Sequence, residues 1–140
     1  MIYLLDTNTC IRFLNGRSLN LARKLPTVPI KDIATCSIVR AELLYGSKKS
    51  IKSSSSLVAQ EAFLNNFVSL PFDNQTADIY ADIRAQLETT GTPIGPNDFL
   101  IAAIALAHNL ILVTHNTRKF SRVPGLLLED WELLLTNKTT

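Results

Sequence analysis

Three acidic residues lie in apolar segments, where burial of a carboxylate without a partner is energetically unfavourable. Asp6 directly follows an apolar run, Glu42 lies among alanine and leucine, and Asp98 opens an apolar stretch. No basic residue adjoins Asp6 or Asp98, and burying an unpartnered carboxylate is unfavourable. A hard divalent cation such as Mg²⁺ or Mn²⁺ would neutralise them, because it takes oxygen ligands and suits a few carboxylates plus a substrate phosphate. The residue types therefore favour a metal site.

Each acid also has an ordinary structural explanation when it is taken alone. Asp6 and Asp98 both suit the N-cap position of a helix, where the side chain accepts a backbone N–H. Glu42, on an amphipathic helix, would more often face solvent. Only convergence of the three at one place favours metal chemistry over these readings.

The elements that must position these residues alternate along the chain. Short apolar runs predict strands, and 3.6-residue periodicity with capping and stop residues predicts helices. Strands are expected at residues 2–5, 33–36, 68–72, 111–114 and 126–128. Helices are expected at residues 7–15, 18–25, 37–47, 57–67, 74–90 and from 97 or 98 to 109, with 48–56 as an exposed connection or frayed helix end. This alternation indicates one three-layer α/β domain with a parallel sheet of four to five short strands flanked by helices.

The expected topology brings the acids to one end of the sheet. Ligands of open parallel sheets bind outside the carboxyl ends of the strands. Asp6 and Asn116 each follow a predicted strand. Glu42 lies in the helix after the second strand, and Asp98 begins the helix that precedes the fourth strand. All four positions can therefore face the same edge.

Composition limits the class of protein. The 140 residues are enough for one domain with its own core, and the formal net charge of +2 does not by itself indicate nucleic-acid binding. No apolar run reaches the roughly 18 residues of a membrane span. The N-terminus lacks the pattern of a signal peptide, so a cytoplasmic protein is expected.

Cys10 and Cys36 are expected to be reduced core thiols, although a disulfide bridge between them stays open.

Short segments in a fixed order resemble the successive motifs of VapC-type PIN domains. The similarity runs from residue 2 to about residue 131. The segments are Tyr3-Leu4-Leu5-Asp6-Thr7-Asn8, Ala41-Glu42-Leu43-Leu44-Tyr45-Gly46, Gly91-Thr92-Pro93-Ile94-Gly95-Pro96-Asn97-Asp98, Val113-Thr114-His115-Asn116-Thr117-Arg118-Lys119-Phe120, and Val123-Pro124-Gly125-Leu126 with Glu129-Asp130-Trp131.

The resemblance implies a PIN domain over residues 1–132 with a short tail at 133–140. It implies a Mg²⁺- or Mn²⁺-dependent endoribonuclease, the toxin of a type II toxin–antitoxin pair, which forms a homodimer and is inhibited by a VapB-like antitoxin. By position, Asp6, Glu42 and Asp98 match the family's three metal-site acids. Asn116 stands where the family often has a fourth acid, so it keeps an oxygen ligand but no charge.

The resemblance also implies supporting residues and a substrate. Asn8 and Thr114 match positions that support the site through hydrogen bonds. Basic side chains could contact the RNA phosphates beside the site or could simply be solvated. These side chains are Lys48, Lys49, Lys52, Arg118, Lys119 and Arg122. A structured RNA such as a tRNA loop is a plausible substrate by resemblance, but no residue here selects it.

Two other classes of function stay open from the residues alone. An acid directly after a strand also fits a phosphoacceptor signalling domain, or a phosphatase with an aspartate nucleophile. The phosphatase usually has a second Asp two residues on, where this chain has Asn8. A metal-free RNA- or protein-binding module derived from a PIN nuclease is the second alternative, which Asn116 makes conceivable. Metal-dependent cleavage of RNA separates these classes.

Overall fold

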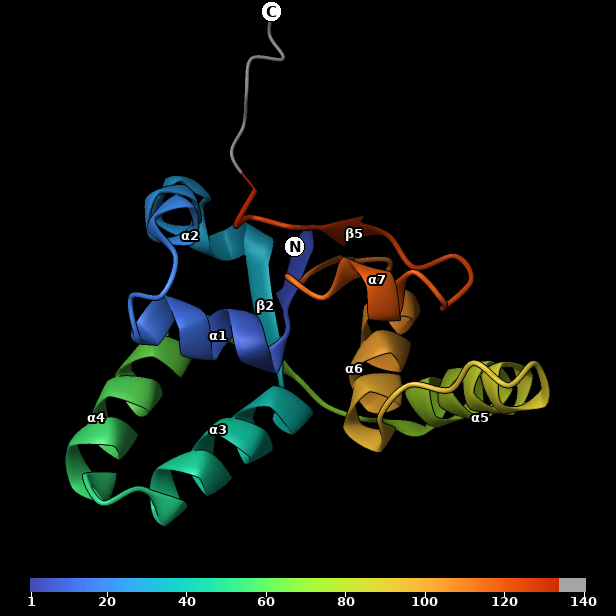
Figure 1. Ribbon diagram of the computed structural model, residues 1–140, viewed down its shortest axis with the longest axis horizontal. Coiled ribbons are helices and arrows are strands. Elements are labelled where there is room, and N and C mark those ends of the chain that lie inside the picture. The colour runs from blue at the N-terminus through green and yellow to red at the C-terminus, as the bar shows by residue number, and fades with distance from the viewer. Residues whose placement is uncertain (134–140) are drawn as a thin grey trace, which may run out of the picture.

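Five parallel strands form the centre of the molecule (Figure 1). The structure, a computed structural model, describes residues 1–133, so residues 134–140 of the predicted tail lie outside the described residues. The strands are β1 (Tyr3–Leu5), β2 (Ile33–Cys36), β3 (Val68–Leu70), β4 (Ile111–Val113) and β5 (Leu128–Glu129). Their order in the sheet is β3-β2-β1-β4-β5. The predicted α/β fold with a parallel sheet of four to five short strands is confirmed.

The strand order reverses between β1 and β4. The chain builds outward from β1 through β2 to β3 and then returns to place β4 on the other side of β1. Leu5 is in register with Val113, and the backbone N–H of Asp6 still donates to the carbonyl of Val113 at 3.1 Å. Asp6 therefore leaves the sheet at the switch point, where open parallel sheets bind ligands.

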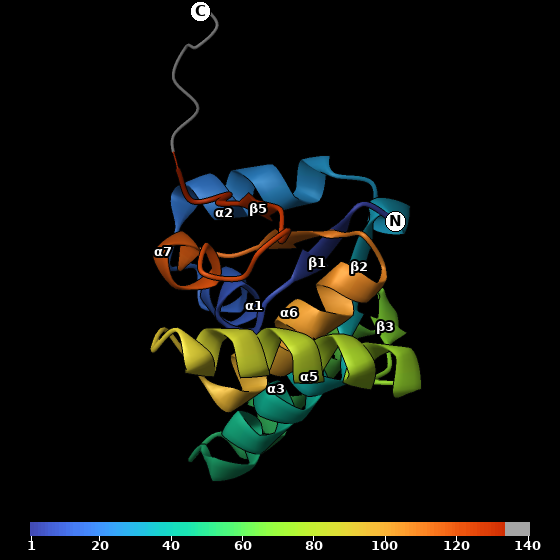
Figure 2. The same cartoon turned by 90° about the vertical axis from the view of Figure 1, so that its right-hand side faces the viewer.

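Seven α-helices surround the sheet within the described residues. They are α1 (Thr7–Leu14), α2 (Leu19–Lys24), α3 (Ser37–Lys49), α4 (Ser53–Leu64), α5 (Asn74–Thr89), α6 (Pro96–Ala107) and α7 (Thr117–Phe120), with short 3₁₀ turns at Leu25–Thr27 and Ile30–Asp32. In Figure 1, α1 and α2 lie on one side of the strands and α5 and α6 on the other, while α3 and α4 extend below. Figure 2 looks onto α5, which crosses in front of α6.

The core lies between the sheet and the helices that cover it. Leu4 and Leu5 of β1 are completely buried, and so is most of α6 from Phe99 to Ala105. The cysteines Cys10 and Cys36 are buried and unbridged, in agreement with the predicted core thiols. No helix within residues 1–133 has the length and apolar character to cross a membrane.

Several boundaries differ from the prediction, and three of them lie near the site or the end of the sheet. Helix α4 already begins at Ser53, so much of the segment 48–56 is helical, and a hydrogen bond between the hydroxyls of Ser47 and Ser56 (3.0 Å) joins α3 to α4. Helix α6 begins at Pro96, whose fixed φ suits the first helical position. The last strand is Leu128–Glu129 rather than 126–128. These shifts leave Asp6, Glu42, Asp98 and Asn116 at the same end of the sheet.

Candidate metal site

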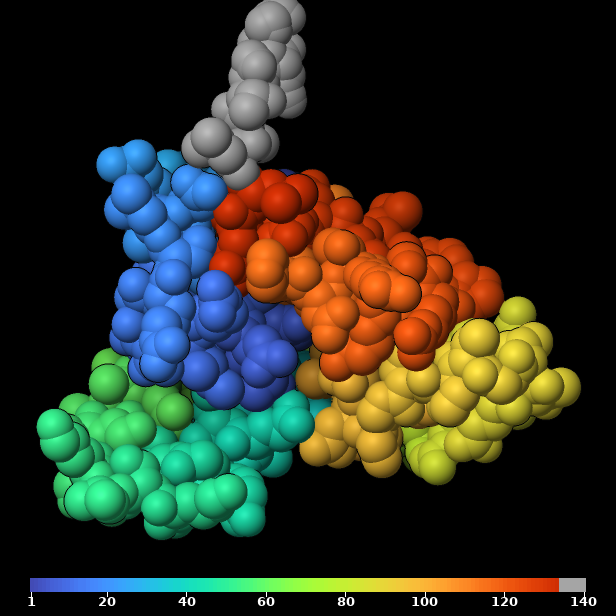
Figure 3. Space-filling model, viewed as in Figure 1, coloured from blue at the N-terminus to red at the C-terminus, as the bar shows by residue number. Residues whose placement is uncertain are grey.

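The site is assembled from the ends of several elements at the carboxyl edge of the sheet. Asp6 joins β1 to α1, Glu42 lies in α3, Asp98 lies in the first turn of α6, and Asn116 precedes α7. In the space-filling view the surface is hollowed where α1, α3, α6 and α7 meet (Figure 3). The fold therefore brings the predicted residues around one depression.

Asp6 is the most buried of the three acids. Its side chain is an N-cap, with Oδ1 accepting the backbone N–H of Thr9 at 2.7 Å, and the residue is 4% exposed. Burial raises the pKa of Asp6, hydrogen bonds from Thr114 and Thr9 lower it, and the nearby charge of Asp98 raises it further. The net result is a raised pKa, so the ionised carboxylate is destabilised until a cation balances it.

Two buried threonines hold Asp6 in place. Thr9 donates its hydroxyl to the carbonyl of Val113 at 3.1 Å, which ties the first turn of α1 to β4. Thr114 hydrogen-bonds to Asp6, and its Oγ1 accepts the backbone N–H of Asn116 at 3.0 Å. Thr114 thus acts on the carboxyl of Asp6, and its supporting role in the site stays a prediction. Asn8, in contrast, is exposed and forms no side-chain hydrogen bond within residues 1–133.

Glu42 connects the starts of two helices. Its Oε1 accepts a short hydrogen bond from the hydroxyl of Thr7, and its Oε2 accepts the side-chain amide of Asn97 at 3.1 Å. Thr7 adjoins Asp6 and Asn97 adjoins Asp98, so Glu42 lies between the other two acids. Sequence reasoning missed Thr7 and Asn97; the only signal for either was its place beside a candidate acid.

Asp98 is not the N-cap of its helix. That position belongs to Gly95, and a Cβ built there would lie 2.8 Å from Oδ2 of Asp98. The missing side chain of Gly95 therefore leaves room for the carboxylate. The same Oδ2 accepts a hydrogen bond from Nζ of Lys119 at 2.7 Å, and the two side chains form an ion pair that the sequence did not indicate.

Asn116 is used as a helix cap in this structure. Its Oδ1 accepts the backbone N–H of Lys119 at 3.3 Å at the start of α7. This is the turn role that such a residue has when it is not a metal ligand.

The basic residues predicted to contact RNA lie in two places. Arg118 is exposed on α7 beside the depression, whereas Lys48 and Lys49 lie at the end of α3 that is remote from α7 (Figure 1). Lys119 is directed to Asp98 instead of to solvent. Of these four side chains, Arg118 is thus the exposed one on α7, which borders the depression.

The three acids do not form a ready-made ligand set. Within the described residues, no three His, Cys, Asp or Glu side chains lie together in a way that could hold a metal ion. Each carboxylate instead contacts a protein donor: Asp6 contacts Thr9, Glu42 contacts Thr7 and Asn97, and Asp98 contacts Lys119.

The residues nevertheless suit a hard cation. Mg²⁺ needs only one or two carboxylates and keeps several waters, so it does not require a closed protein cage. Asp98 is near enough to Asp6 for its charge to add to the raised pKa of Asp6. The ammonium of Lys119 already balances Asp98 as a cation would. Their donor chemistry fits Mg²⁺ or Mn²⁺.

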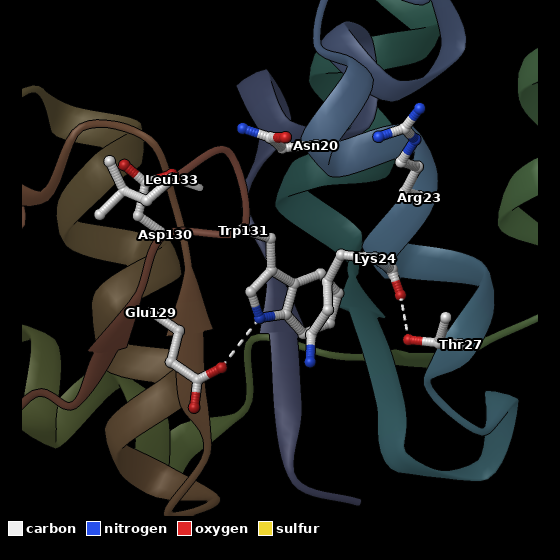
Figure 4. A pocket seen from close by; sticks show the side chains of 8 residues that line it. All are labelled: Asn20, Arg23, Lys24, Thr27, Glu129, Asp130, Trp131 and Leu133. Carbon is white, nitrogen blue, oxygen red and sulfur yellow. Dashed lines mark hydrogen bonds between the residues drawn. The ribbon is translucent and has the colours of Figure 1, made fainter. Parts of the chain in front are cut away.

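A cavity elsewhere is separate from this chemistry. It has a volume of about 560 Å³ and lies between α2 and the segment after β5, with Arg23 and Lys24 on one side and Glu129 and Trp131 on the other (Figure 4). Trp131 donates its Nε1–H to Glu129 at 2.8 Å. None of the three acids lines this cavity, so it is distinct from the candidate metal site.

Comparison with known proteins identifies the class. The PIN domain family model matches residues 3–126. The tRNA(fMet)-specific endonuclease VapC of Salmonella typhimurium is 36% identical over 92% of this chain and 97% of its own length. Ribonuclease VapC2 of Rickettsia felis is 39% identical over 94% and 99%. A crystal structure of DNA-bound VapBC from Salmonella typhimurium superposes with a TM-score of 0.88 at 36% identity, covering 94% of this chain and 98% of that one.

The chain therefore belongs to the PIN-domain family. Its similarity to ribonucleases of the VapC group extends over nearly the whole length of both chains. The activity that follows is that of a toxin endoribonuclease, and this prediction from the sequence motifs is confirmed.

Proposed function

We propose that this protein is a Mg²⁺- or Mn²⁺-dependent endoribonuclease toxin that uses Asp6, Glu42 and Asp98 to hydrolyse RNA phosphodiester bonds in the cytoplasm. One observation carries the proposal: Asp6 and Asp98 come from different elements and meet at the switch point of a parallel sheet, where burial and then the charge of Asp98 raise the pKa of Asp6. Within the described residues neither Asp6 nor Glu42 has an ion-pair partner, so a divalent cation would balance charge that Lys119 leaves uncompensated. Asp6 and Asp98 would hold it, and Glu42 would complete the set.

The chain's own residues position this chemistry. A bound divalent cation supplies a Lewis acid that lowers the pKa of a water and offsets charge on the phosphate. Thr9 and Thr114 orient the carboxylate of Asp6. Thr7 and Asn97 keep Glu42 between the other two acids. Arg118, exposed on α7, can contact a phosphate next to the one that is cut.

The test is cleavage of RNA by the purified chain in Mg²⁺ or Mn²⁺ and in chelator. Asp6→Asn, Glu42→Gln and Asp98→Asn should each remove most of the cleavage while leaving the fold intact. Asp78→Asn, which changes an exposed acid on α5, is the matched control and should cleave like wild type. Full cleavage in excess chelator, or equal activity of Asp98→Asn and Asp78→Asn, would overturn the proposal.

Metal binding has a second readout that does not depend on cleavage. A cation that binds only the folded state at about ten times its Kd stabilises that state by about 1.4 kcal/mol. For a domain of this size the unfolding midpoint should rise by roughly 3–6 °C. We expect this rise across a Mn²⁺ series for wild type, and a flat midpoint for the double variant Asp6→Asn/Asp98→Asn. Equal rises in both proteins would place the metal elsewhere.

The substrate class that we propose is a structured RNA, such as a tRNA. One relative is named as a tRNA(fMet)-specific endonuclease and is 36% identical to this chain over 129 residues. Sequencing the 5′ ends of RNA fragments after brief induction would identify the bond that is cut. Cleavage spread evenly over messenger RNA would contradict a tRNA-specific activity.

We propose a VapB-like antitoxin as the inhibitory partner of a homodimer of this chain. A solved relative is a VapBC assembly, and an acidic depression is complementary to a basic side chain. Arg is the favoured residue because its planar fork pairs with carboxylates in a bidentate manner. Co-purification with the neighbouring gene's product and an Arg→Ala scan of that product would test this. Inhibition that survives every such change would favour steric cover instead.

A further inference from the structure

Among the three candidate metal ligands, Asp98 forms an ion pair, and its partner is Lys119. Its Nζ lies 2.7 Å from Oδ2 of Asp98, and the two side chains are 25% and 26% exposed. None of the ion pairs within the described residues involves Asp6 or Glu42. Lys119 is therefore the cation that balances this acidic site when no metal is bound.

The position of Lys119 is set by the surrounding structure. Its backbone N–H is held by the side chain of Asn116, and its ammonium lies 5.1 Å from the ring centre of Phe120, which is buried. On the other side, Gly95 leaves the room into which the carboxylate of Asp98 projects. The pair is thus supported from α7 and from α6.

The ammonium and a divalent cation would need the same carboxylate. Mg²⁺ binds carboxylate oxygens at about 2.0–2.1 Å, so a metal on Asp98 would lie within a few ångströms of Nζ if the lysine stayed in place. Two positive charges at that separation repel each other strongly in a partly buried site. Metal binding at Asp98 therefore favours the departure of the ammonium.

We propose that Lys119 is an internal counter-cation, which neutralises Asp98 in the metal-free protein and competes with the divalent cation for it. This inference rests on the proposed metal-dependent function and adds its regulation. Lys119 stabilises the metal-free fold and lowers the metal affinity, so that the site fills only when the divalent cation is abundant enough to displace it.

The first experiment measures Mn²⁺ affinity by calorimetry. Lys119→Met keeps the apolar stem and removes the charge, and we expect it to bind Mn²⁺ about tenfold more tightly than wild type. Arg118→Met removes one positive charge from the adjacent residue of the same helix and should stay within about twofold of wild type. Lys119→Arg keeps the charge and should also stay near wild type. Equal affinities of Lys119→Met and Arg118→Met, or weaker binding by Lys119→Met, would overturn the inference.

The second experiment uses thermal unfolding in chelator and in saturating Mn²⁺. If the lysine and the metal exclude each other, Lys119→Met should unfold at a lower temperature than Arg118→Met in chelator, and this gap should close in Mn²⁺. A gap of the same size under both conditions would mean that Lys119 has a structural role only. The proposed function fails differently: wild type and Asp98→Asn would then respond identically to Mn²⁺.

Discussion

At the scale of single residues, two aspartates are both helix N-caps, but their pKa values are shifted in opposite directions. Asp6 caps α1 and Asp73 caps α5, each through the backbone N–H three residues on. Burial raises the pKa of Asp6, whereas hydrogen bonds from Thr76 lower the pKa of Asp73. The cap at α5 thus favours the ionised aspartate, while the cap at α1 keeps a charge that the metal-free protein does not favour.

This contrast predicts that Asp6→Asn separates stability from activity. The amide keeps an oxygen for the N–H of Thr9 and removes a buried charge, so the unfolding midpoint in chelator should be unchanged or higher. RNA cleavage should fall by roughly 10²–10³, because the cation that Asp6 would hold stabilises the charge that develops on the phosphate. Asp73→Asn is the control, and it should lower the midpoint and leave cleavage intact. A clear loss of stability in Asp6→Asn would show that its charge has a partner in the metal-free protein.

At the scale of elements, the start of α6 determines where Asp98 can lie. Pro96 occupies the first helical position and Gly95 the N-cap, so the helix begins at a defined residue. Asp98 then falls in the first turn, where the partial positive charge of the helix end favours a carboxylate. Since its Oδ2 would be only 2.8 Å from a Cβ at position 95, the cap residue also controls the direction of the carboxylate.

Gly95→Ala should therefore damage the site more than the fold. The added methyl group must displace the end of the Asp98 side chain, and misplacement of a catalytic group by about 1 Å can cost as much as 10²-fold in rate. We expect cleavage to drop roughly tenfold or more, with little change in the unfolding midpoint. Gly46→Ala is the control, because a Cβ there meets nothing within 4 Å and Ala is favoured in a helix by about 0.5–1 kcal/mol. Equal activities of the two variants would mean that Asp98 has room to move.

At the scale of the whole molecule, the segment after β5 is tied back to the first helix. Arg12 of α1 donates two hydrogen bonds to Glu132, at 2.6 and 2.7 Å. His115, which follows Thr114, pairs with Asp130 at 3.0 Å. These contacts join the described end of the chain to α1 and to the loop that carries Thr114 and Asn116. The end of the domain thus supports one side of the acidic site.

The contact between Arg12 and Glu132 predicts a specific pH dependence of stability. Hydrogen bonds from Arg12 lower the pKa of Glu132 below its usual 4.5. A lowered folded-state pKa stabilises the protein above the unfolded value, and that contribution is lost as pH falls through the folded value. Glu132→Gln should lower the unfolding midpoint by a few degrees at pH 7, and the difference from wild type should shrink well below pH 4.5. A difference that is constant across this range would exclude ionisation as its cause.

The sequence alone determined the order of strands and helices and the edge at which the acids meet. These features depend on local patterns, since an apolar run, a capping residue or a stop residue predicts nearly the same element in any tertiary context. Asp6, Glu42 and Asp98 could be named because each interrupts such a pattern and because the motifs around them occur in a known order. The parallel sheet followed from the alternation of elements.

Only the tertiary structure decided which partner each acid has. Glu42 meets Thr7 and Asn97, which are 35 and 55 residues away in sequence, and Asp98 meets Lys119 at a separation of 21. A helix turns by about 100° per residue, so the rotation of α1 about its axis brings Thr7 to the site and leaves the neighbouring Asn8 exposed. That rotation, and the strand order that sets α7 beside α6, result from packing over the whole core, which no local pattern in the sequence encodes.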